Sequence, residues 1–393
     1  MSLKFNTLKE IYSLVVDELT KIFTDGGVML LLFGATIIYP LLYSITYQPE
    51  VLTDAPIAII DEDNSALSRN FIRMMDATPE VSIYSAAMDI SDAQNMFYSG
   101  DVAGILLIPE DFSQSISKGI QAHVSVYADA SYMMLYKQVY TATIMASQTL
   151  GKQIEVKKRM MKGTPREAAI KQSSPIGFSA RGLYNPSGGY GSYAMPAILV
   201  LVLQQTLLLG IGMRGGTARE LGAQHFLLPV KASRKGVLRI IIAKTLAYLL
   251  LYIPISFYLF VVVFQIFSFP MAGSPADMFV LVMPLILASI LLGFLFTTLF
   301  KNRENSIIFL LFTSVPLVFL SGFSWPMESF PFGFRFLAYL FPSTPGIQGI
   351  LKINVMGGTW HNALPEIATL WVMTVVLFLA NWIIVRIKMV RDR

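Results

Sequence analysis

Cysteine is absent from the sequence, and histidine occurs only three times, at His123, His225 and His361. Without cysteine the chain has no disulfide, no thiolate metal ligand and no thiol nucleophile. The histidines lie far apart and no HExxH motif occurs, so each is expected to make a structural hydrogen bond and not a metal contact. The sequence therefore predicts neither a metal site nor thiol chemistry.

Charged residues are also scarce, at 14% of the 393 residues, whereas about 25% is usual for a soluble domain. Hydrophobic residues make up 54% and the mean hydropathy is +0.58. These values predict a mainly α-helical polytopic protein surrounded by a lipid bilayer. A net charge of +5 in a soluble chain would suggest nucleic acid. Here the excess flanks apolar runs, as membrane topology requires, and no nucleic-acid partner is expected.

A GxxxxGK[ST] phosphate loop is missing, since Gly151-Lys152-Gln153 lacks the upstream glycine and the hydroxyl residue. The predicted span interiors hold no ionisable residue except Lys244 at one edge, which we expect to snorkel toward the headgroups. An ion-driven carrier is thus disfavoured. The chain is predicted not to be an enzyme and to bind no cofactor, so energy for any transport must come through another protein.

The first 27 residues form an amphipathic pattern. Apolar residues recur at three- and four-residue steps, at Leu8, Ile11, Tyr12, Val15, Leu19 and Ile22. Polar residues fall opposite, at Lys9, Glu10, Ser13, Asp17, Glu18 and Lys21. We expect a helix in the cytoplasmic headgroup layer, with packing on other protein as the alternative. Because no cleavable signal peptide is recognisable, the first span is expected to direct membrane insertion.

Six apolar runs, uncharged apart from Lys244, are long enough to cross a bilayer. The first covers residues 28–49, and the others lie within residues 193–393, at 193–213, 240–267, 278–300, 305–323 and 367–385. The segments that would face the cytoplasm together hold 15 Lys or Arg, while the short outer loops after the third span hold only Arg335 and Lys352. This asymmetry predicts a multi-pass protein of the bacterial cytoplasmic (inner) membrane with both termini in the cytoplasm.

Residues 50–190 are polar, with short apolar runs, and predict a mixed α/β extracytoplasmic domain. Strands are expected at 55–61, 81–86, 101–108 and 123–129. The expected helices follow the Ser65 cap, the Ser91–Gln94 capping box and Pro109, and the second and third end at Gly100 and Gly119. A long helix over 130–161 ends in a basic cluster of Lys157, Lys158, Arg159 and Lys162. A solvated face is favoured for this cluster over a patch for lipid or an acidic partner.

One charged island, residues 214–239, separates the second and third spans and carries six Lys or Arg against one acid, Glu220. Thr217-Ala218-Arg219-Glu220 fits a capping box. We therefore expect a short helix from about Ala218 to Phe226, lying along the membrane, that a soluble partner could grip. The motif alone is weak, because any loop can contain a capped turn.

The stretch 324–360 is too rich in Pro and Gly for a span and too apolar for an ordinary loop. We expect short re-entrant helices before the last span. Irregular backbone at membrane depth has to be covered by protein or water, so this segment is predicted to lie in the protein interior.

Taken in this order, the sequence resembles the permease subunits of type-2 ABC exporters, in the branch with a large extracytoplasmic domain. TARELG resembles the coupling-helix segment of that family, and SGFSWPMESFPFGFRFLAYLFPSTPGIQGI resembles the Gly-Phe-x-x-Pro segment before the last span. IDEDNSALSR and AGILLIPEDFSQSISKG resemble the extracytoplasmic domain. At its entry to the first span the chain has Thr24-Asp25-Gly26-Gly27, without the usual Arg and Pro.

The resemblance implies a dimer with a second copy or a sister permease, coupled to two ATP-binding subunits that hold ATP and Mg²⁺. It places Thr217, Arg219, Glu220 and Leu221 in a groove of the ATPase, and marks Gly322, Phe323, Pro326 and Pro342 as the re-entrant segment's characteristic residues. A periplasmic adaptor is a further candidate partner.

Two functions remain open at this point. The first is an ATP-driven exporter of an amphipathic or lipid-like compound, to which aromatic and Met residues such as Met195, Phe294, Phe309 and Phe312 are suited, although such residues also face lipid. The second is a non-transporting membrane sensor or anchor that displays the α/β domain. A single anchor needs only one or two spans, which favours the exporter.

Overall fold

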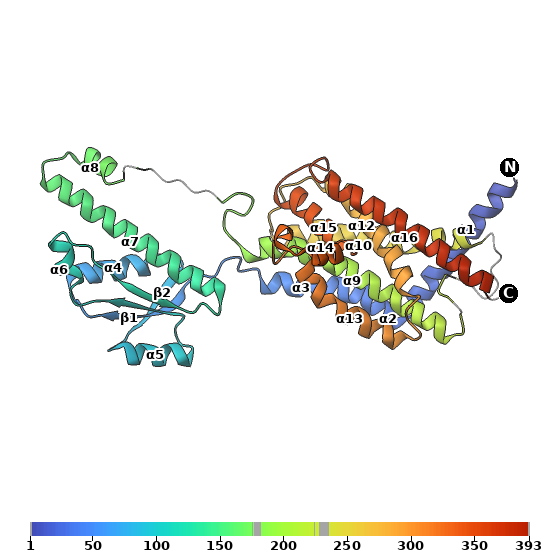
Figure 1. Cartoon of the computed structure of the whole chain (residues 1–393), viewed down its shortest axis with the longest axis horizontal. Coiled ribbons are helices and arrows are strands. Elements are labelled where there is room, and N and C mark those ends of the chain that lie inside the picture. The colour runs from blue at the N-terminus through green and yellow to red at the C-terminus, as the bar shows by residue number, and fades with distance from the viewer. Residues whose placement is uncertain (1, 175, 177–181, 224, 228–235, 392–393) are drawn as a thin grey trace. The chain divides into compact units, whose positions relative to one another are not determined.

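The computed structural model describes residues 2–174, 176, 182–223, 225–227 and 236–391. The chain divides into two compact units. The membrane unit comprises Met1–Glu50 and Gly182–Arg393, and the inserted unit comprises Val51–Arg181 (Figure 1).

The described part of the membrane unit is helical throughout, and six of its helical stretches are long and apolar enough to cross a membrane. They are Gly26–Thr46, Tyr190–Glu220, Val237–Ile266, Pro275–Phe296, Arg303–Leu320 and Leu364–Lys388. The predicted fold class and all six predicted spans are therefore confirmed. The elements that build these spans are α2 (Gly26–Met29), η1 (Leu30–Ala35), α3 (Thr36–Thr46), α9 (Tyr190–Glu220), α10 (Val237–Phe257), η2 (Tyr258–Val262), α11 (Val263–Ile266), α12 (Pro275–Phe296), α13 (Arg303–Leu320) and α16 (Leu364–Arg391).

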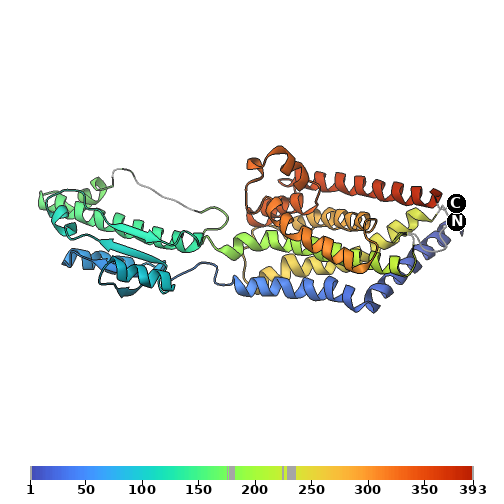
Figure 2. The same ribbon diagram turned by 60° about the horizontal axis from the view of Figure 1, so that its bottom comes forward.

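Successive spans run in opposite directions, which gives the bundle two ends (Figure 2). The terminal end carries α1 (Ser2–Thr24), the end of α9, the start of α10, the α12–α13 connection and the C-terminal end of α16. The opposite end carries the end of α3, the start of α9 and the segment that joins α13 to α16.

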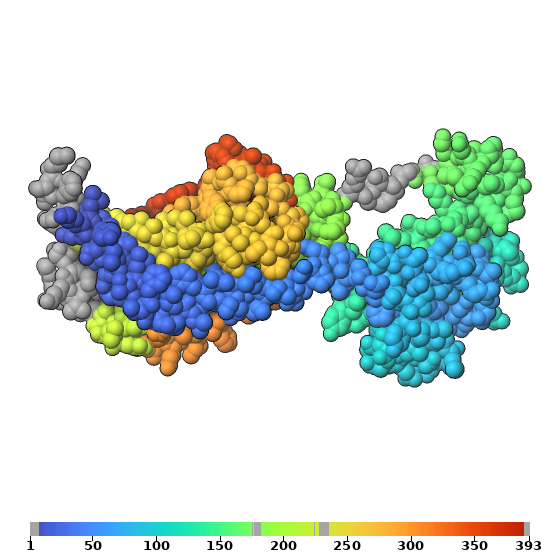
Figure 3. All heavy atoms as spheres, turned by 180° about the vertical axis from the view of Figure 1, so that it is seen from behind, coloured from blue at the N-terminus to red at the C-terminus, as the bar shows by residue number. Residues whose placement is uncertain are grey.

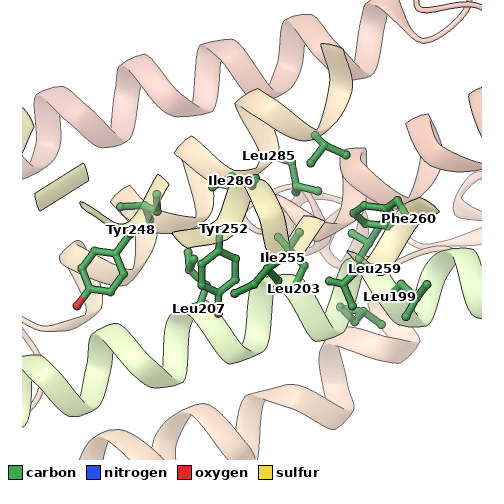
Figure 4. Close-up of a cluster of buried hydrophobic side chains, with 14 of the residues drawn as sticks. Leu199, Leu203, Leu207, Tyr248, Tyr252, Ile255, Leu259, Phe260, Leu285 and Ile286 are labelled. Atoms are coloured by element: carbon green, nitrogen blue, oxygen red, sulfur yellow. The ribbon is translucent and has the colours of Figure 1, made fainter. Parts of the chain in front are cut away.

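Helix α9 lies at the centre of the membrane unit, and most of its side chains are buried. Its leucines pack against Tyr252 and Ile255 of α10 and Leu285 of α12 in one apolar cluster (Figure 4). The buried Tyr252 hydroxyl is satisfied at 3.0 Å by the hydroxyl of Thr206 on α9. A helix that is apolar on all sides is expected to be buried on all sides, and α9 fits this description.

Helix α1 packs on α10, so that one stripe of the predicted amphipathic helix lies against protein (Figure 3). Val15 of α1 meets Ala243 and Ala247 of α10. A second apolar set on α1 stays exposed, at Leu8, Tyr12, Val16 and Phe23. This second set leaves a face free for headgroups, so the location of the helix at the membrane surface stays a prediction.

The segment before the last span consists of short helices, as predicted. They are η3 (Met327–Ser329), α14 (Phe332–Ala338), α15 (Ser343–Ile350) and η4 (Leu351–Val355). Almost every residue of α15 is buried, and α15 packs on α9, α12 and α16. The predicted interior position is therefore confirmed for α15, whereas α14 is mostly exposed.

The inserted unit has a four-stranded sheet in the order β2-β1-β3-β4. Its strands are β1 (Ala55–Asp61), β2 (Val81–Ala86), β3 (Gly104–Ile108) and β4 (Ser125–Ala128), of which only β4 is antiparallel to its neighbour. Helices α4 (Ala66–Asp76), α6 (Phe112–Ser117) and α7 (Met133–Met161) cover one face, and α5 (Ile90–Ser99) covers the other (Figure 1). The short α8 (Arg166–Gln172) follows α7.

Most of the predicted elements of this unit are found, and Ser65 caps α4 as expected. The Ser91–Gln94 capping box is wrong: Asp89 caps α5 by accepting a hydrogen bond from the Asp92 amide at 2.8 Å. Both residue types are good caps. The helix begins two residues earlier than predicted, and its Ala93 is fully buried against the sheet. The predicted end of this helix at Gly100 is confirmed, with φ of 83°.

We predict that Phe71→Ala destabilises the inserted unit. Phe71 is 2% exposed and packs on the ring of Phe112, so its removal leaves a cavity that costs about 3 to 5 kcal/mol. The measurement is protease resistance of the inserted unit within the full chain as urea is raised. Tyr98→Ala is the control, because Tyr98 is 82% exposed; equal resistance of the two variants would contradict the prediction.

Candidate functional site at the terminal end

Helix α9 continues to Glu220, past the point at which the sequence suggested a break. The predicted capped helix from Ala218 to Phe226 is therefore wrong, and Thr217, Arg219 and Glu220 form the last turn of α9. Leu221 is its C-cap residue, and Gly222 follows in the left-handed conformation with φ of 85°. Such a glycine is a common helix end.

The Gly215–Gly216 pair is the reason that α9 can continue. A Cβ on Gly215 would lie 2.5 Å from Thr297 Cγ2, and one on Gly216 would lie 2.5 Å from the Arg303 backbone nitrogen. The two glycines thus let α9 approach the α12–α13 connection closely. This gain in packing outweighs the low helix propensity of the two glycines.

Arg303, the first residue of α13, joins three helix ends. Its backbone amide donates to Glu220 Oε1 at 2.8 Å, so the last turn of α9 supplies an acceptor for the start of α13. Its guanidinium donates to both carboxylate oxygens of Asp25, at 2.6 and 3.0 Å, a bidentate geometry that arginine favours. Thr217 Oγ1 lies 3.5 Å from the same guanidinium.

Asp25 is also the N-cap of α2, where its Oδ1 accepts from the Val28 amide at 3.2 Å. Burial alone would raise the pKa of Asp25, but the hydrogen bonds from Arg303 and Val28 outweigh it, and the pKa lies below its usual value. Asp25 is therefore a carboxylate that fixes the first span to α13. The unusual Thr24-Asp25-Gly26-Gly27 entry noted in the sequence carries this cap.

Glu18 of α1 forms a second, deeper group of charges. It is 1% exposed, and its Oε2 accepts from Lys244 Nζ of α10 at 2.6 Å. Its Oε1 lies 3.6 Å from Arg214 Nε of α9 and 3.3 Å from the Tyr248 hydroxyl. One carboxylate thus lies between two cations from two different spans.

Two predictions about these residues are wrong. Lys244 does not snorkel outward: its side chain is only 15% exposed, and its ammonium lies between Glu18 and the ring of Phe226, 3.5 Å from the ring centroid. Glu18 does not lie on the polar face of α1. Glu18 falls three residues after Val15 and four before Ile22, so it shares their buried face.

The charge of Glu18 follows from its neighbours. Burial by itself would raise the pKa of this carboxyl, but the charges of Lys244 and Arg214 outweigh it, and the pKa lies below its usual value. The carboxylate is therefore ionised and holds α1 against α9 and α10 at once.

His225 lies in the connection that follows α9 and is fully buried. Its Nδ1 accepts from the Leu227 amide at 3.0 Å, the structural hydrogen bond expected for a histidine here. Burial, followed by the positive charges of Lys388, Arg219 and Lys244, lowers the pKa of His225 to about 3. The imidazole is thus neutral at physiological pH and carries its proton on Nε2.

The four residues that the sequence marked for ATPase contact divide into two pairs. Thr217 and Glu220 converge on Arg303, as described above. Arg219 and Leu221 do not join this cluster, and the Leu221 side chain is 81% exposed at the tip of α9. Residues 224 and 228–235 of the same charged island lie outside the described residues.

The Gly-Phe-x-x-Pro segment lies at the opposite end, where it also contacts α9. Gly322 ends α13 with φ of 77°, and a Cβ there would lie 2.7 Å from Gln348 Nε2. The Phe323 carbonyl accepts from the Tyr193 hydroxyl at 2.7 Å. Pro326 precedes η3 and is exposed.

Pro342 is buried directly before α15. The next amide, that of Ser343, donates to Gln204 Oε1 at 2.6 Å. Gln204 lies midway along α9 and is fully buried, so this bond satisfies an amide at the start of α15 that has no partner within its own helix. Helix α9 is thus bonded at its end to α13 and near its middle to α15.

The side chains considered for cargo contact also divide. Met195 and Phe294 are fully buried and belong to the core. Phe309 and Phe312 of α13 line an open apolar groove of about 590 Å³, and Phe312 is 84% exposed. The outer face of α13 therefore has few partners among the described residues.

Sequence reasoning missed Asp25, Glu18, Arg214 and Arg303 as members of the terminal-end cluster. The helical spacing of Glu18 with Val15 and Ile22 was the available signal. Arg303 was read only as a topology marker, because nothing local indicates that its partner lies 278 positions earlier in the chain.

Glu18 and Lys244 should differ in how much their loss destabilises the membrane unit. Glu18→Leu leaves Lys244 and Arg214 buried without their counter-ion and should cost about 3 kcal/mol. Lys244→Leu leaves Glu18 paired with Arg214 and should cost about 1 kcal/mol. The thermal midpoint in detergent measures both, with Asp17→Leu as the control, since Asp17 forms an exposed pair with Lys21. A larger loss for Lys244→Leu would refute this order.

Comparison with known proteins shows which family the sequence of this chain matches. Residues 27–383 match the family model described as ABC-2 family transporter protein. A linearmycin resistance permease protein of Bacillus subtilis (strain 168) is 22% identical over 370 residues, which cover 89% of this chain and 92% of that protein. A probable multidrug ABC transporter permease of Escherichia coli (strain K12) is 22% identical over 341 residues, covering 84% of this chain and 86% of that protein. Both alignments are too long to fit within one compact unit.

Proposed function

The chain belongs to the ABC-2 transporter family, and from this premise we propose that it is the permease of an ATP-driven exporter that moves an amphipathic or lipid-like compound outward. The chain is a transmembrane transporter subunit of a family that associates with ABC ATP-binding subunits. In our proposal those subunits hold ATP and Mg²⁺, and this chain binds no cofactor of its own.

The observation that carries the proposal is the double attachment of α9. At its tip, Glu220 binds the start of α13; near its middle, Gln204 binds the start of α15. A push on the exposed Leu221 would therefore move α13 and α15 together with α9. We propose that closure of the ATPase subunits supplies this push at Thr217, Arg219, Glu220 and Leu221.

In this proposal α9 itself moves as one rigid helix, and no separate coupling helix is involved. Since α9 is one helix from Tyr190 to Glu220 and its interior proline, Pro196, lies beyond Gln204 as seen from the tip, displacement at the tip reaches Gln204 through unbroken helix. Arg303 would carry the first span along through Asp25. Phe323 and Pro342, at the two places where the re-entrant segment meets α9, would then respond to the same motion.

The proposed class of transported compound rests on the apolar groove along α13 and on the descriptions of the relatives. The groove along Phe309 and Phe312 is apolar and open, which suits an amphipathic compound that enters from the bilayer. The relatives are described as a linearmycin resistance permease and a probable multidrug permease, and we propose a related role here. A second copy or a sister permease would face α13, because apolar side chains on its outer face, such as Phe312, are exposed in the described part of the chain.

We propose that the protein lies in the bacterial inner membrane with both termini in the cytoplasm. The support is the concentration of Lys and Arg in the segments at the terminal end. The inserted unit would then be extracytoplasmic, where it could meet a periplasmic adaptor.

Glu220→Lys should abolish transport and cargo-stimulated ATP hydrolysis in proteoliposomes that contain the ATPase partner, while the protein still reaches the membrane. The substitution places a cation against the helix N-terminus of α13, where positive charge is unfavourable, and removes the acceptor for the Arg303 amide. Glu304→Lys is the matched control, because it also places a cation at the first turn of α13 but leaves the bond from the Arg303 amide to Glu220 in place. Unchanged transport by the Glu220 variant would refute the proposed coupling.

Gln204→Leu should lower the same two activities by about ten-fold, since a lost hydrogen bond to a buried amide costs about 1 to 3 kcal/mol. Basal ATP hydrolysis and membrane insertion should stay near normal, because Gln204 lies far along α9 from the tip. Gln265→Leu makes the same change at an exposed position and should have no effect. Full transport by both variants would show that the α9–α15 bond is not part of the transmission.

A further inference from the structure

The inserted unit contains a groove between the C-terminal half of α7 and α8. Its volume is about 750 Å³, within the range of about 300 to 1,000 Å³ that is usual for small-molecule sites. Val156 and Met160 of α7 lie one turn apart on the side of the helix that lines it. Ile170 contributes from α8.

The floor of this groove is apolar and exposed. Met160, Met161 and Ile170 are 44%, 74% and 40% exposed. Methionine side chains are flexible and polarisable, and they suit binding surfaces that adapt to different apolar ligands. A cluster of such residues in one groove marks a surface that gains from being covered.

The rim of the groove is cationic. Lys152 and Lys157 come from α7 and Arg166 comes from α8, so positive charge is contributed by both helices. Among the described residues that line the groove there is no carboxylate. The nearest acid along α7, Glu155, forms an ion pair with Arg159 at 2.7 Å.

We propose that this groove binds an anionic single-chain amphiphile, with its acyl chain on Val156, Met160, Met161 and Ile170 and its head group between Lys152, Lys157 and Arg166. An acyl chain satisfies the apolar floor, and an anion satisfies the cationic rim, for which the lining supplies no counter-charge. Neither a purely apolar compound nor a small inorganic anion would use both features. The site lies entirely in the inserted unit, so the inference does not depend on the direction of transport or on ATP coupling.

The test uses the full-length protein in phosphatidylcholine nanodiscs and a photoactivatable diazirine analogue of lauric acid. After irradiation, mass spectrometry should locate the label on peptides that contain Met160, Met161 or Ile170. Unlabelled laurate should compete, whereas dodecyltrimethylammonium and acetate should not. The combined variant K152E/K157E/R166E should lose about ten-fold or more of the competable label, as expected for the loss of charge-assisted contacts of about 1.5 to 3 kcal/mol.

The matched control is R73E/K118E/K137E, which makes the same change in net charge at three exposed positions of the inserted unit outside the groove. It should label within about two-fold of the unmodified protein. K152Q/K157Q/R166Q, which removes the cations without adding acids, should show an intermediate loss and guards against a folding defect in the reversal variant.

Three outcomes would overturn the proposal. Equal competition by laurate and dodecyltrimethylammonium would show that the groove holds any apolar chain. Equal labelling of the reversal and control variants would show that the cations are not used. Retention of an acidic amphipathic peptide on the groove, with no competable laurate label, would assign the surface to a protein partner. None of these outcomes bears on transport, which is tested separately through Glu220 and Gln204.

Discussion

The ion pair between Arg303 and Asp25 is the contact on which the arrangement of the membrane unit depends. The Arg303 side chain fixes the start of α13 to the start of the first span, and the Arg303 backbone amide donates to Glu220 in the last turn of α9. Helix ends carry unsatisfied backbone groups and partial charges. In this protein the end of α9 and the starts of α13 and α2 meet. Glu220 of α9 accepts from the first amide of α13, and Arg303 of α13 binds Asp25, the N-cap of α2. These contacts therefore couple the end of α9 and the starts of α13 and α2, so that none of the three moves independently of the others.

Glu18 also joins several helices through charged contacts, at a more deeply buried position. A buried carboxylate is costly unless its partners are well placed, and here Lys244 and Arg214 come from two different spans. The main effect of these ion pairs is therefore to fix α1 in one position, and their net contribution to stability is the smaller effect. Helix α1 belongs to the bundle by this bond and by the apolar contacts of Val15, while its other face remains open.

Helix α9 gains its role from position and not from any unusual residue. It is surrounded by other helices along most of its length, and two polar side chains near its middle make bonds to elements far away in the sequence. Gln204 and Thr206 bind α15 and α10. In our proposal the same rigidity that stabilises the core also transmits a displacement from one end of the bundle to the other.

The sequence by itself determined the six spans, the inserted α/β unit and the short helices before the last span, because span length, hydropathy and turn residues are local properties. It did not determine where α9 ends. Thr217-Ala218-Arg219-Glu220 suggests a helix start locally, and only the close approach of Gly215 and Gly216 to Thr297 and Arg303 shows why α9 continues through it. The partners of Glu18 and Asp25 were likewise decided by tertiary structure. The sequence shows that a residue is ionisable. Only the packing of helices that are distant in the sequence shows which opposite charge it contacts.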